Sequence, residues 1–320
     1  MSSDDTWSIG ELAERAGTTV KTVRFYSDRG LLPEARRSTG GHRRYGPEAL
    51  DRLRLIRSLR TLDLPVPDVG RVLGREDAPD GAADGVLDGV LEDVIAERLR
   101  EIGSRMAALR WREAALQLLR DCPAGERADR LLLIGSISTP PSTASLVRFW
   151  RAWIPRRLPA RLASAIVDQA VPPPPEDPTP AQVLAFARLH AFVSGDCNGA
   201  DNRPAVHRPE EGYRPAVLYD GLIEAYALAS AELRAGSPAR PGEALDCFVS
   251  AYAHSRGTPD TPAFRRLLGG QLAADPRIDH YWGLVAELIS PPSGPPEPTA
   301  GSAHAWLSAA LDADTAREAA

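Results

Sequence analysis

With 320 residues, 43% of them hydrophobic, the chain is long enough for two domains with their own cores, and its three scattered cysteines exclude a disulfide framework. No apolar run is long enough to cross a bilayer, so we expect a cytoplasmic protein without membrane contact. The formal net charge of −5 is unevenly distributed. Residues 1–75 contain 14 basic and 10 acidic residues, whereas the remaining residues contain 24 basic and 33 acidic ones. Attraction for phosphate is therefore concentrated at the amino-terminal end.

Residues 7–26 have the pattern of two short helices joined by a tight turn. Ser8 can cap the first helix, Gly17 has the backbone freedom that the turn needs, and Thr18 or Thr19 can cap the second helix. The sequence therefore predicts a helix-turn-helix near the amino terminus.

The second of these helices carries its cations on one face. Val20 and Val23 are predicted to face the first helix, which leaves Lys21 and Arg24 pointing outward. Cations in this position are typical of a helix that enters the major groove of DNA. The pattern therefore indicates DNA binding.

A basic hairpin and two further helices follow. Gly40 and Gly41 are expected to reverse the chain between two short strands, so that Arg43 and Arg44 lie beside the helix pair. Pro47 opens a third helix that extends to residue 61, and a short fourth helix is expected over residues 67–73. We therefore predict a winged helix-turn-helix DNA-binding domain over residues 1–75.

This segment resembles the MerR family of transcription regulators. The resemblance rests on four blocks that occur in the family's order, Ile-Gly-Glu-Leu-Ala at 9–13, Val-Arg-Phe-Tyr at 23–26, Gly-Leu-Leu at 30–32 and Gly-His-Arg-Arg-Tyr at 41–45. It implies a homodimer that binds a pseudo-palindromic site in double-stranded promoter DNA and distorts the spacer, so that RNA polymerase can engage both promoter elements. By position it implies the DNA-binding residues Thr19, Lys21, Arg24, Tyr26, Arg43, Arg44 and Tyr45. His42 stands where the family usually has tyrosine.

Residues 86–119 are predicted to form one long helix without an internal proline. Apolar residues recur at alternating steps of four and three, which is typical of a coiled coil, and the stripe consists of Ile95, Leu99, Ile102, Met106, Leu109 and Leu116. Glu113 interrupts it. In the resembled family the helix after the DNA-binding module pairs antiparallel with its twin, which implies a dimerisation helix over residues 80–121. The alternative is an amphipathic helix that lies on the carboxy-terminal domain.

Cys122 follows this helix, where metal-sensing members of the resembled family carry their ligand loop. In the copper-sensing version a second cysteine stands where this chain has Arg130, whose positive charge opposes binding of a cation. Cys197 with His190 and His207 lacks the tight spacing of a ligand set. We therefore expect no metal site and no cofactor.

The rest of the chain has helical stripes and no strand-like alternation, so the expected fold class is mainly α, with an all-α carboxy-terminal domain. Connecting helices and the proline-rich linker 171–180 are predicted within residues 122–180, and an effector or ligand-sensing domain over residues 181–320. Helices are expected in this domain at about 180–193, 213–235, 242–256, 261–274, 278–289 and 304–316.

The carboxy-terminal half shows no phosphate loop, no paired carboxylates and no nucleophile beside a base, so we do not expect an enzyme. Its aromatic residues can line a pocket for a small hydrophobic effector, and the candidates are Trp150, Trp153, Tyr219, Tyr226, Tyr252, Tyr281 and Trp282. The alternatives are that these aromatics form only a core, and that this half is a protein-interaction module without a small ligand.

Overall fold

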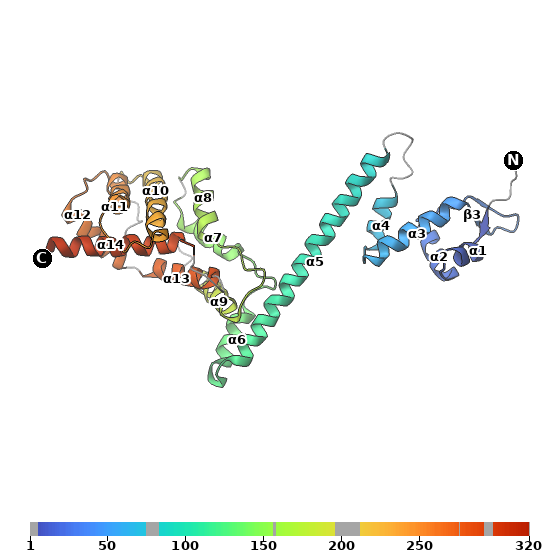
Figure 1. Ribbon diagram of the computed structural model, residues 1–320, viewed down its shortest axis with the longest axis horizontal. Coiled ribbons are helices and arrows are strands. Elements are labelled where there is room, and N and C mark those ends of the chain that lie inside the picture. Colours follow the sequence, from blue (N-terminus) through green and yellow to red (C-terminus); the bar gives the residue numbers. More distant parts are fainter. Residues whose placement is uncertain are drawn as a thin grey trace. The chain divides into compact units, whose positions relative to one another are not determined.

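The computed structural model describes residues 6–74, 83–155, 158–195, 212–274, 276–290 and 297–319 (Figure 1). The chain divides into two compact units, Met1–Ser104 and Arg105–Ala320. Helix α5 (Ala83–Asp121) contributes its first part to one unit and its second part to the other. The predicted fold class, mainly α with a winged helix-turn-helix at the amino terminus, is confirmed.

The first unit begins with the helix-turn-helix and its wing. Its elements are β1 (Trp7–Ser8), α1 (Ile9–Arg15), α2 (Val20–Asp28), β2 (Arg36–Arg37), β3 (Arg43–Tyr45), α3 (Pro47–Thr61) and α4 (Val66–Leu73). The three strands form an antiparallel sheet in the order β1-β3-β2, with Trp7 opposite Tyr45 and Arg36 opposite Arg44. The sequence predicted only the β2–β3 hairpin, because the two residues of β1 are too few to show alternation.

Local capping determines where α1 and α2 begin. Ser8 and Glu11 form a capping box, in which the Ser8 amide donates to Glu11 Oε2 at 2.6 Å and the Glu11 amide donates to Ser8 Oγ at 3.2 Å. Gly17 adopts a φ of +59° in the turn, where a residue with a side chain would be strained. Thr19 caps α2 by accepting a hydrogen bond from the Thr22 amide at 3.1 Å.

The turn sets the packing of α2 on α1. Val23 is completely buried, together with Leu12 of α1 and Ile56 of α3. Val20, which was predicted to face α1, is instead 40% exposed, because it is the first residue of α2 and lies at the rim of the contact.

The second unit is built from helices in the residues described. After the second part of α5 come the 3-10 turn η1 (Ala124–Glu126), α6 (Arg127–Gly135), α7 (Ala144–Trp153), α8 (Ala160–Ala170), α9 (Pro180–Ser194), α10 (Pro215–Arg234), α11 (Glu243–Arg256), α12 (Pro262–Ala273), α13 (Arg277–Ile289) and α14 (Ala300–Ala319). The sequence did not predict α6, none of whose residues is fully buried, because a helix without a buried stripe gives no periodic signal. Within the described ranges, each helix is too short or too polar to cross a membrane.

Two hydrophobic cores fill this unit. In the first, the α9–α13 core, α9 and α13 pack side by side with α7 and the second part of α5 (Figure 1), and its buried residues include Trp111, Phe149, Phe186, Tyr281 and Leu288. In the second, the α10–α11 core, these two helices pack together with α12 and α14, and its buried residues include Leu218, Phe248, Tyr252, Leu268 and Leu307.

Residues 122–180 are part of the second unit, whereas the sequence indicated a separate connecting region. The proline-rich stretch is non-helical as predicted, yet α7 and α8 before it contribute buried residues to the same cores as the helices after it. The Trp111 indole N–H even donates to the carbonyl of Pro175 at 3.0 Å. The helices before and after the proline-rich stretch therefore share their cores, and the structure has no domain boundary there. Composition alone could not show this long-range packing.

Candidate nucleic-acid interface and aromatic cavity

The outer face of α2 carries two exposed cations. Lys21 and Arg24 form no hydrogen bond or ion pair with any other residue that the structure describes. Thr19 is exposed as well, although its hydroxyl is engaged in capping the helix. Solvated cations on one helix face are suited to contacts with phosphates and base edges.

The two arginines of the wing are paired with carboxylates of their own domain. Arg43 Nη1 lies 2.5 Å from Asp28 Oδ1, and its Nε lies 2.9 Å from Glu34 Oε1. Arg44 Nη1 lies 3.5 Å from Glu11 Oε2. The Asp28 hydrogen bond raises the pKa of Arg43 further above its ordinary value. Arg43 therefore fastens the wing to the end of α2, and its charge is largely compensated.

Two tyrosines that were predicted to contact DNA lie in the core instead. Tyr45 is completely buried, and its hydroxyl donates to Ser27 Oγ at 2.9 Å, while Tyr26 is 8% exposed. Alternation along β3 places Arg43 and Tyr45 on the same inward face of the strand. A completely buried ring cannot touch DNA, so the prediction for Tyr45 is wrong and its role is to hold β3 against α2.

A groove joins α2 to the wing. Its walls are Ser8, Ile9, Gly10, Arg24, Asp28, Gly41, His42 and Arg43. The fold thus brings Arg24 together with the wing residues His42 and Arg43, whereas Lys21 does not line this groove. Sequence reasoning missed Gly10 as a wall residue, because a glycine in the first turn of a helix carries no chemical signal of its own.

The second candidate surface is the apolar stripe of α5. All six residues of the predicted stripe are between 39% and 67% exposed, namely Ile95, Leu99, Ile102, Met106, Leu109 and Leu116. Another face of the same helix buries Trp111, Ala114 and Leu118 in the α9–α13 core. The alternative prediction, an amphipathic helix that lies on the carboxy-terminal domain, therefore holds for that other face of α5. The six residues of the stripe do not pack on this domain and stay exposed.

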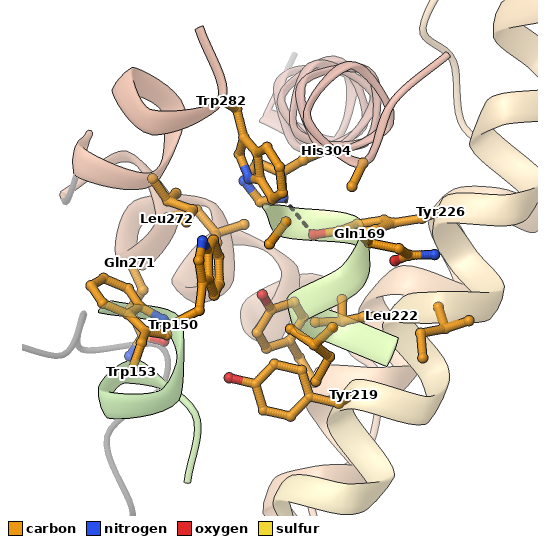
Figure 2. A pocket seen from close by; sticks show the side chains of 16 residues that line it. Trp150, Trp153, Gln169, Tyr219, Leu222, Tyr226, Gln271, Leu272, Trp282 and His304 are labelled. Carbon is orange, nitrogen blue, oxygen red and sulfur yellow. Dashed lines mark hydrogen bonds between the residues drawn. The ribbon is translucent and has the colours of Figure 1, made fainter. Parts of the chain in front are cut away.

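An aromatic cavity lies between the two cores of the second unit (Figure 2). It is lined by six of the seven predicted pocket residues, Trp150, Trp153, Tyr219, Tyr226, Tyr252 and Trp282. Trp150 and Trp153 of α7 lie on one side, and Tyr219 and Tyr226 of α10 lie on the opposite side. About 790 Å³ of space is free of protein atoms when the open mouth is included, whereas the centre of a water molecule can move through about 80 Å³. The inner cavity is therefore narrow.

Tyr281, the seventh predicted residue, does not line the cavity. Its ring is fully buried and stacks on Phe149, with ring centres 5.9 Å apart and planes inclined by 12°. Its hydroxyl donates to the carbonyl of Ala170 at 2.5 Å. Successive helical residues point about 100° apart, and on α13 Trp282 faces the cavity while the Tyr281 ring points into the α9–α13 core.

The cavity contains one titratable pair that sequence reasoning missed. His304 of α14 is 5% exposed, and its Nδ1 lies 3.0 Å from the Tyr226 hydroxyl, while its Nε2 lies 3.7 Å from Asp279 Oδ1. Burial lowers the pKa of His304, an effect that Asp279 partly opposes, and burial raises the pKa of Tyr226. Both groups are therefore neutral near pH 7. His304 was missed because its alanine-rich helix contains no aromatic stripe.

The surroundings of Cys122 are those of a packed thiol. Its Sγ donates to the carbonyl of Leu119 at 3.3 Å, and the neighbouring Arg130 pairs with Glu126 at 2.5 Å. The described residues contain no group of three or more His, Cys, Asp or Glu side chains that could hold a metal ion. Of the other ligands considered above, Cys197 and His207 lie outside the described residues.

Comparisons with known proteins concern the helix-turn-helix and its wing. Residues 7–76 match the family described as MerR HTH family regulatory protein. The chain is 42% identical over 67 residues to nodulation protein NolA of Bradyrhizobium elkanii, which is 21% of this chain and 31% of that protein. It is 40% identical over 70 residues to the HTH-type transcriptional regulator ZntR homolog of Haemophilus influenzae, covering 22% and 52% of the two chains. It is 45% identical over 67 residues to the HTH-type transcriptional activator TipA of Streptomyces coelicolor, covering 21% and 26%. The matches thus span from about a quarter to about half of these relatives.

Proposed function

Residues 7–76 form a helix-turn-helix domain of the MerR family, and on this premise we propose that the protein is a transcription regulator that binds double-stranded promoter DNA. The observation that carries the proposal is the pair of unpaired, exposed cations Lys21 and Arg24 on the outer face of α2. In this assignment α2 enters the major groove and the wing contacts the sugar-phosphate backbone. Similarity over the same residues to the HTH-type transcriptional regulator ZntR homolog and to the HTH-type transcriptional activator TipA supports the same function.

The residues of α2 and the wing divide into those assigned to DNA contact and those that support them. Lys21 and Arg24 are assigned to the DNA, with Thr19 beside them. Arg43 and Arg44 keep partial solvent access and are assigned to phosphates, with the carboxylates of Asp28 and Glu11 holding their orientation. The buried tyrosines stabilise this arrangement from within the domain.

The exposed stripe of α5 supports a homodimer. Six apolar side chains in one row are an unusual surface for a monomer, and a second copy of the same helix is complementary to it. A two-fold dimer presents two recognition helices to a pseudo-palindromic site. We propose that it distorts the promoter spacer and thereby lets RNA polymerase engage both promoter elements, as the family resemblance implies.

Replacement of Arg24 by alanine is expected to weaken binding to the protein's own promoter by about 1 kcal/mol, roughly fivefold, and to flatten the salt dependence by about one unit of slope. Binding should be measured by fluorescence anisotropy at several salt concentrations. Arg112→Ala on α5, which also removes an exposed arginine, is the charge-matched control and should change neither quantity. An unaltered affinity and slope for Arg24→Ala would remove this residue from the interface.

The aromatic cavity supports regulation by a small organic ligand. Apolar, aromatic walls with few polar groups are the usual features of a small-molecule site. A protein-interaction module remains the second candidate, and one observation favours it, namely the exposure of Leu131 and Leu132 on α6 to 56% and 75%. A thermal-shift screen with hydrophobic compounds separates the two, because a bound ligand raises the unfolding temperature by mass action.

A transition metal is not expected to be the signal. Cys122 supplies a single thiolate ligand, and Arg130 stands at the position where a second thiolate ligand would be needed. Titration with copper, zinc or mercury should therefore give no stoichiometric binding and no change in promoter activity. Tight binding that disappears in Cys122→Ser would restore the interpretation of the protein as a metal sensor.

A further inference from the structure

We propose that the aromatic cavity takes a neutral, flat ring compound with a hydrogen-bond acceptor, and that the Trp150 indole N–H recognises this acceptor. The inference rests on the proposed function only in treating the cavity as the effector site. It adds a chemical class of ligand and a residue that selects for it.

The walls favour a ring. Trp150 and Trp282 approach one another with ring centres 5.8 Å apart, and Tyr219 and Tyr226 lie across the space from Trp150 (Figure 2). Leu222 and Leu272 fill positions between them. Aromatic side chains on opposite sides of a narrow space favour a flat partner, since stacked and edge-on ring contacts then form on both sides.

The charges favour a neutral ligand. None of the sixteen described residues that line the cavity is Asp, Glu, Lys or Arg, and burial keeps His304 uncharged by lowering its pKa. Charged residues of both signs contact the lining from outside. Asp279 lies beside His304, Arg256 donates a hydrogen bond to Gln271 at 2.9 Å, and the Arg277 guanidinium carbon lies 5.9 Å from the centre of a Trp153 ring. A charged ligand would lose its hydration here without gaining a dedicated counter-charge.

The Trp150 indole supplies the reason for an acceptor. Its residue is only 5% exposed, it lines the cavity, and its Nε1 has no hydrogen-bond partner among the described residues. The indoles of Trp111 and Trp306 instead donate to the carbonyls of Pro175 and Ser237, each at 3.0 Å. Buried indole N–H groups are normally satisfied in this way.

The nearest protein acceptor, the Tyr281 hydroxyl, does not complete a hydrogen bond with the Trp150 N–H. The Tyr281 hydroxyl lies near the Trp150 indole. Burial raises the pKa of Tyr281, and the nearby indole N–H partly opposes this rise. The two groups nevertheless do not complete a hydrogen bond, and Tyr281 gives its own proton to the Ala170 carbonyl. The Trp150 N–H therefore has no completed hydrogen bond among the described residues, and an acceptor on a bound molecule can supply one.

Three small probes of one size test the proposal on the full-length protein. These are 1-indanone, which is neutral and carries a carbonyl acceptor, indane, which is neutral and lacks one, and 2-aminoindane, which is a cation at pH 7. Binding should be measured by calorimetry and by tryptophan fluorescence. We expect 1-indanone to bind about fivefold more tightly than indane, the effect of one hydrogen bond, and 2-aminoindane to bind more weakly than either.

Two matched variants assign the selection to one residue. Trp150→Phe should remove the difference between 1-indanone and indane, because the ring remains and the N–H is lost. Trp153→Phe, which shortens another wall of the cavity, should weaken both probes equally and keep their ratio. In case Trp150→Phe does not fold, the indole proton resonance of Trp150 in the ¹⁵N-labelled wild-type protein gives an independent test, and it should move downfield with 1-indanone but not with indane.

Equal affinities for 1-indanone and indane in the wild-type protein, or tightest binding of 2-aminoindane, would overturn the assigned ligand class. No binding of any probe would overturn the cavity as a ring-binding site. Promoter binding in the same preparations separates these failures from a failure of the proposed function, because the DNA contacts of α2 do not depend on the cavity.

Discussion

The double substitution Leu99→Glu with Ile102→Glu is expected to convert the protein into monomers and to abolish tight promoter binding. Both side chains are exposed in the single chain, to 64% and 39%, so the substitutions leave the intramolecular cores intact. In an antiparallel pair of α5 helices each glutamate would be buried in the apolar seam, and the like charges of two chains would meet there. Burying unpaired charges in such a seam costs about 4 kcal/mol, which is on the order of a thousandfold in the dimer dissociation constant.

Light scattering at micromolar concentration measures the oligomeric state. Fluorescence anisotropy with full-site and half-site DNA measures how the loss of the dimer changes the affinity for the promoter. The matched control is Arg100→Gln with Ser104→Glu, which changes the net charge equally at exposed positions of α5 outside the stripe and should leave a dimer. A monomeric variant should bind full-site DNA with the affinity of a half-site. Persistence of the dimer in Leu99→Glu with Ile102→Glu would place the interface on the carboxy-terminal unit.

Features that depend on neighbours in the sequence were predictable. The capping box of Ser8 and Glu11, the glycine turn at Gly17 and the proline that opens α3 act within one helical turn, so they can be recognised from the residue types alone. The stripe of α5 was predictable for the same reason, since the spacing of its apolar residues can be recognised within the sequence of one helix. The bounds of α9, α11 and α12 follow from similar local signals, whereas α6 was missed and α14 begins four residues earlier than expected.

Features that depend on which elements meet were not predictable. Arg43 appeared to be a free cation, but alternation on β3 turns it toward Asp28 and Glu34, which the sequence could not place beside it. Likewise Trp111 lies within a helix predicted for dimerisation, and only the fold shows that it packs on Phe186, with ring centres 5.4 Å apart. The aromatic residues of α7, α10, α11 and α13 that line the cavity could be proposed from the sequence. His304 could be added to them only once the position of α14 was known.

A partly buried ion cluster around Arg265 gives the second large expected effect. Arg265 of α12 is 15% exposed and binds three carboxylates, with Nη2 2.8 Å from Asp246 Oδ1 and 2.6 Å from Asp260 Oδ2, and Nη1 2.8 Å from Asp314 Oδ2. These partners lie on α11, on the loop before α12 and on α14. One guanidinium thus ties together the elements that surround the α10–α11 core.

The substitution Arg265→Leu is expected to lower the free energy of unfolding of the second unit by about 3 kcal/mol at neutral pH, because it leaves the buried carboxylate of Asp314 and the partly exposed carboxylates of Asp246 and Asp260 without the counter-charge of Arg265. Urea unfolding followed by circular dichroism measures this loss. Arg317→Ala provides the control, since Arg317 binds the same Asp314 at 3.1 Å but is 66% exposed, and its loss should cost less than about 1 kcal/mol. A loss of similar size in the two variants would show that burial of the cluster is not what makes Arg265 important.

The pH dependence of the same substitution distinguishes lost charge compensation from lost packing. In the wild-type protein burial acts to raise the pKa of Asp314, but the hydrogen bonds from Arg265 and Arg317 outweigh it and hold the pKa below its ordinary value of 3.8. Asp314 therefore stabilises the fold above that value, and this contribution is lost as the pH falls through the lowered pKa. In Arg265→Leu the burial of Asp314 remains while the hydrogen bond from Arg265 is gone, so the pKa of Asp314 rises, and protonation at falling pH then neutralises a carboxylate that has lost this partner. The difference in unfolding free energy between wild type and Arg265→Leu should consequently shrink as the pH falls from neutral toward and below 3.8. A difference that stays constant over this range would mean that Arg265 stabilises the unit through its packing and not through its charge.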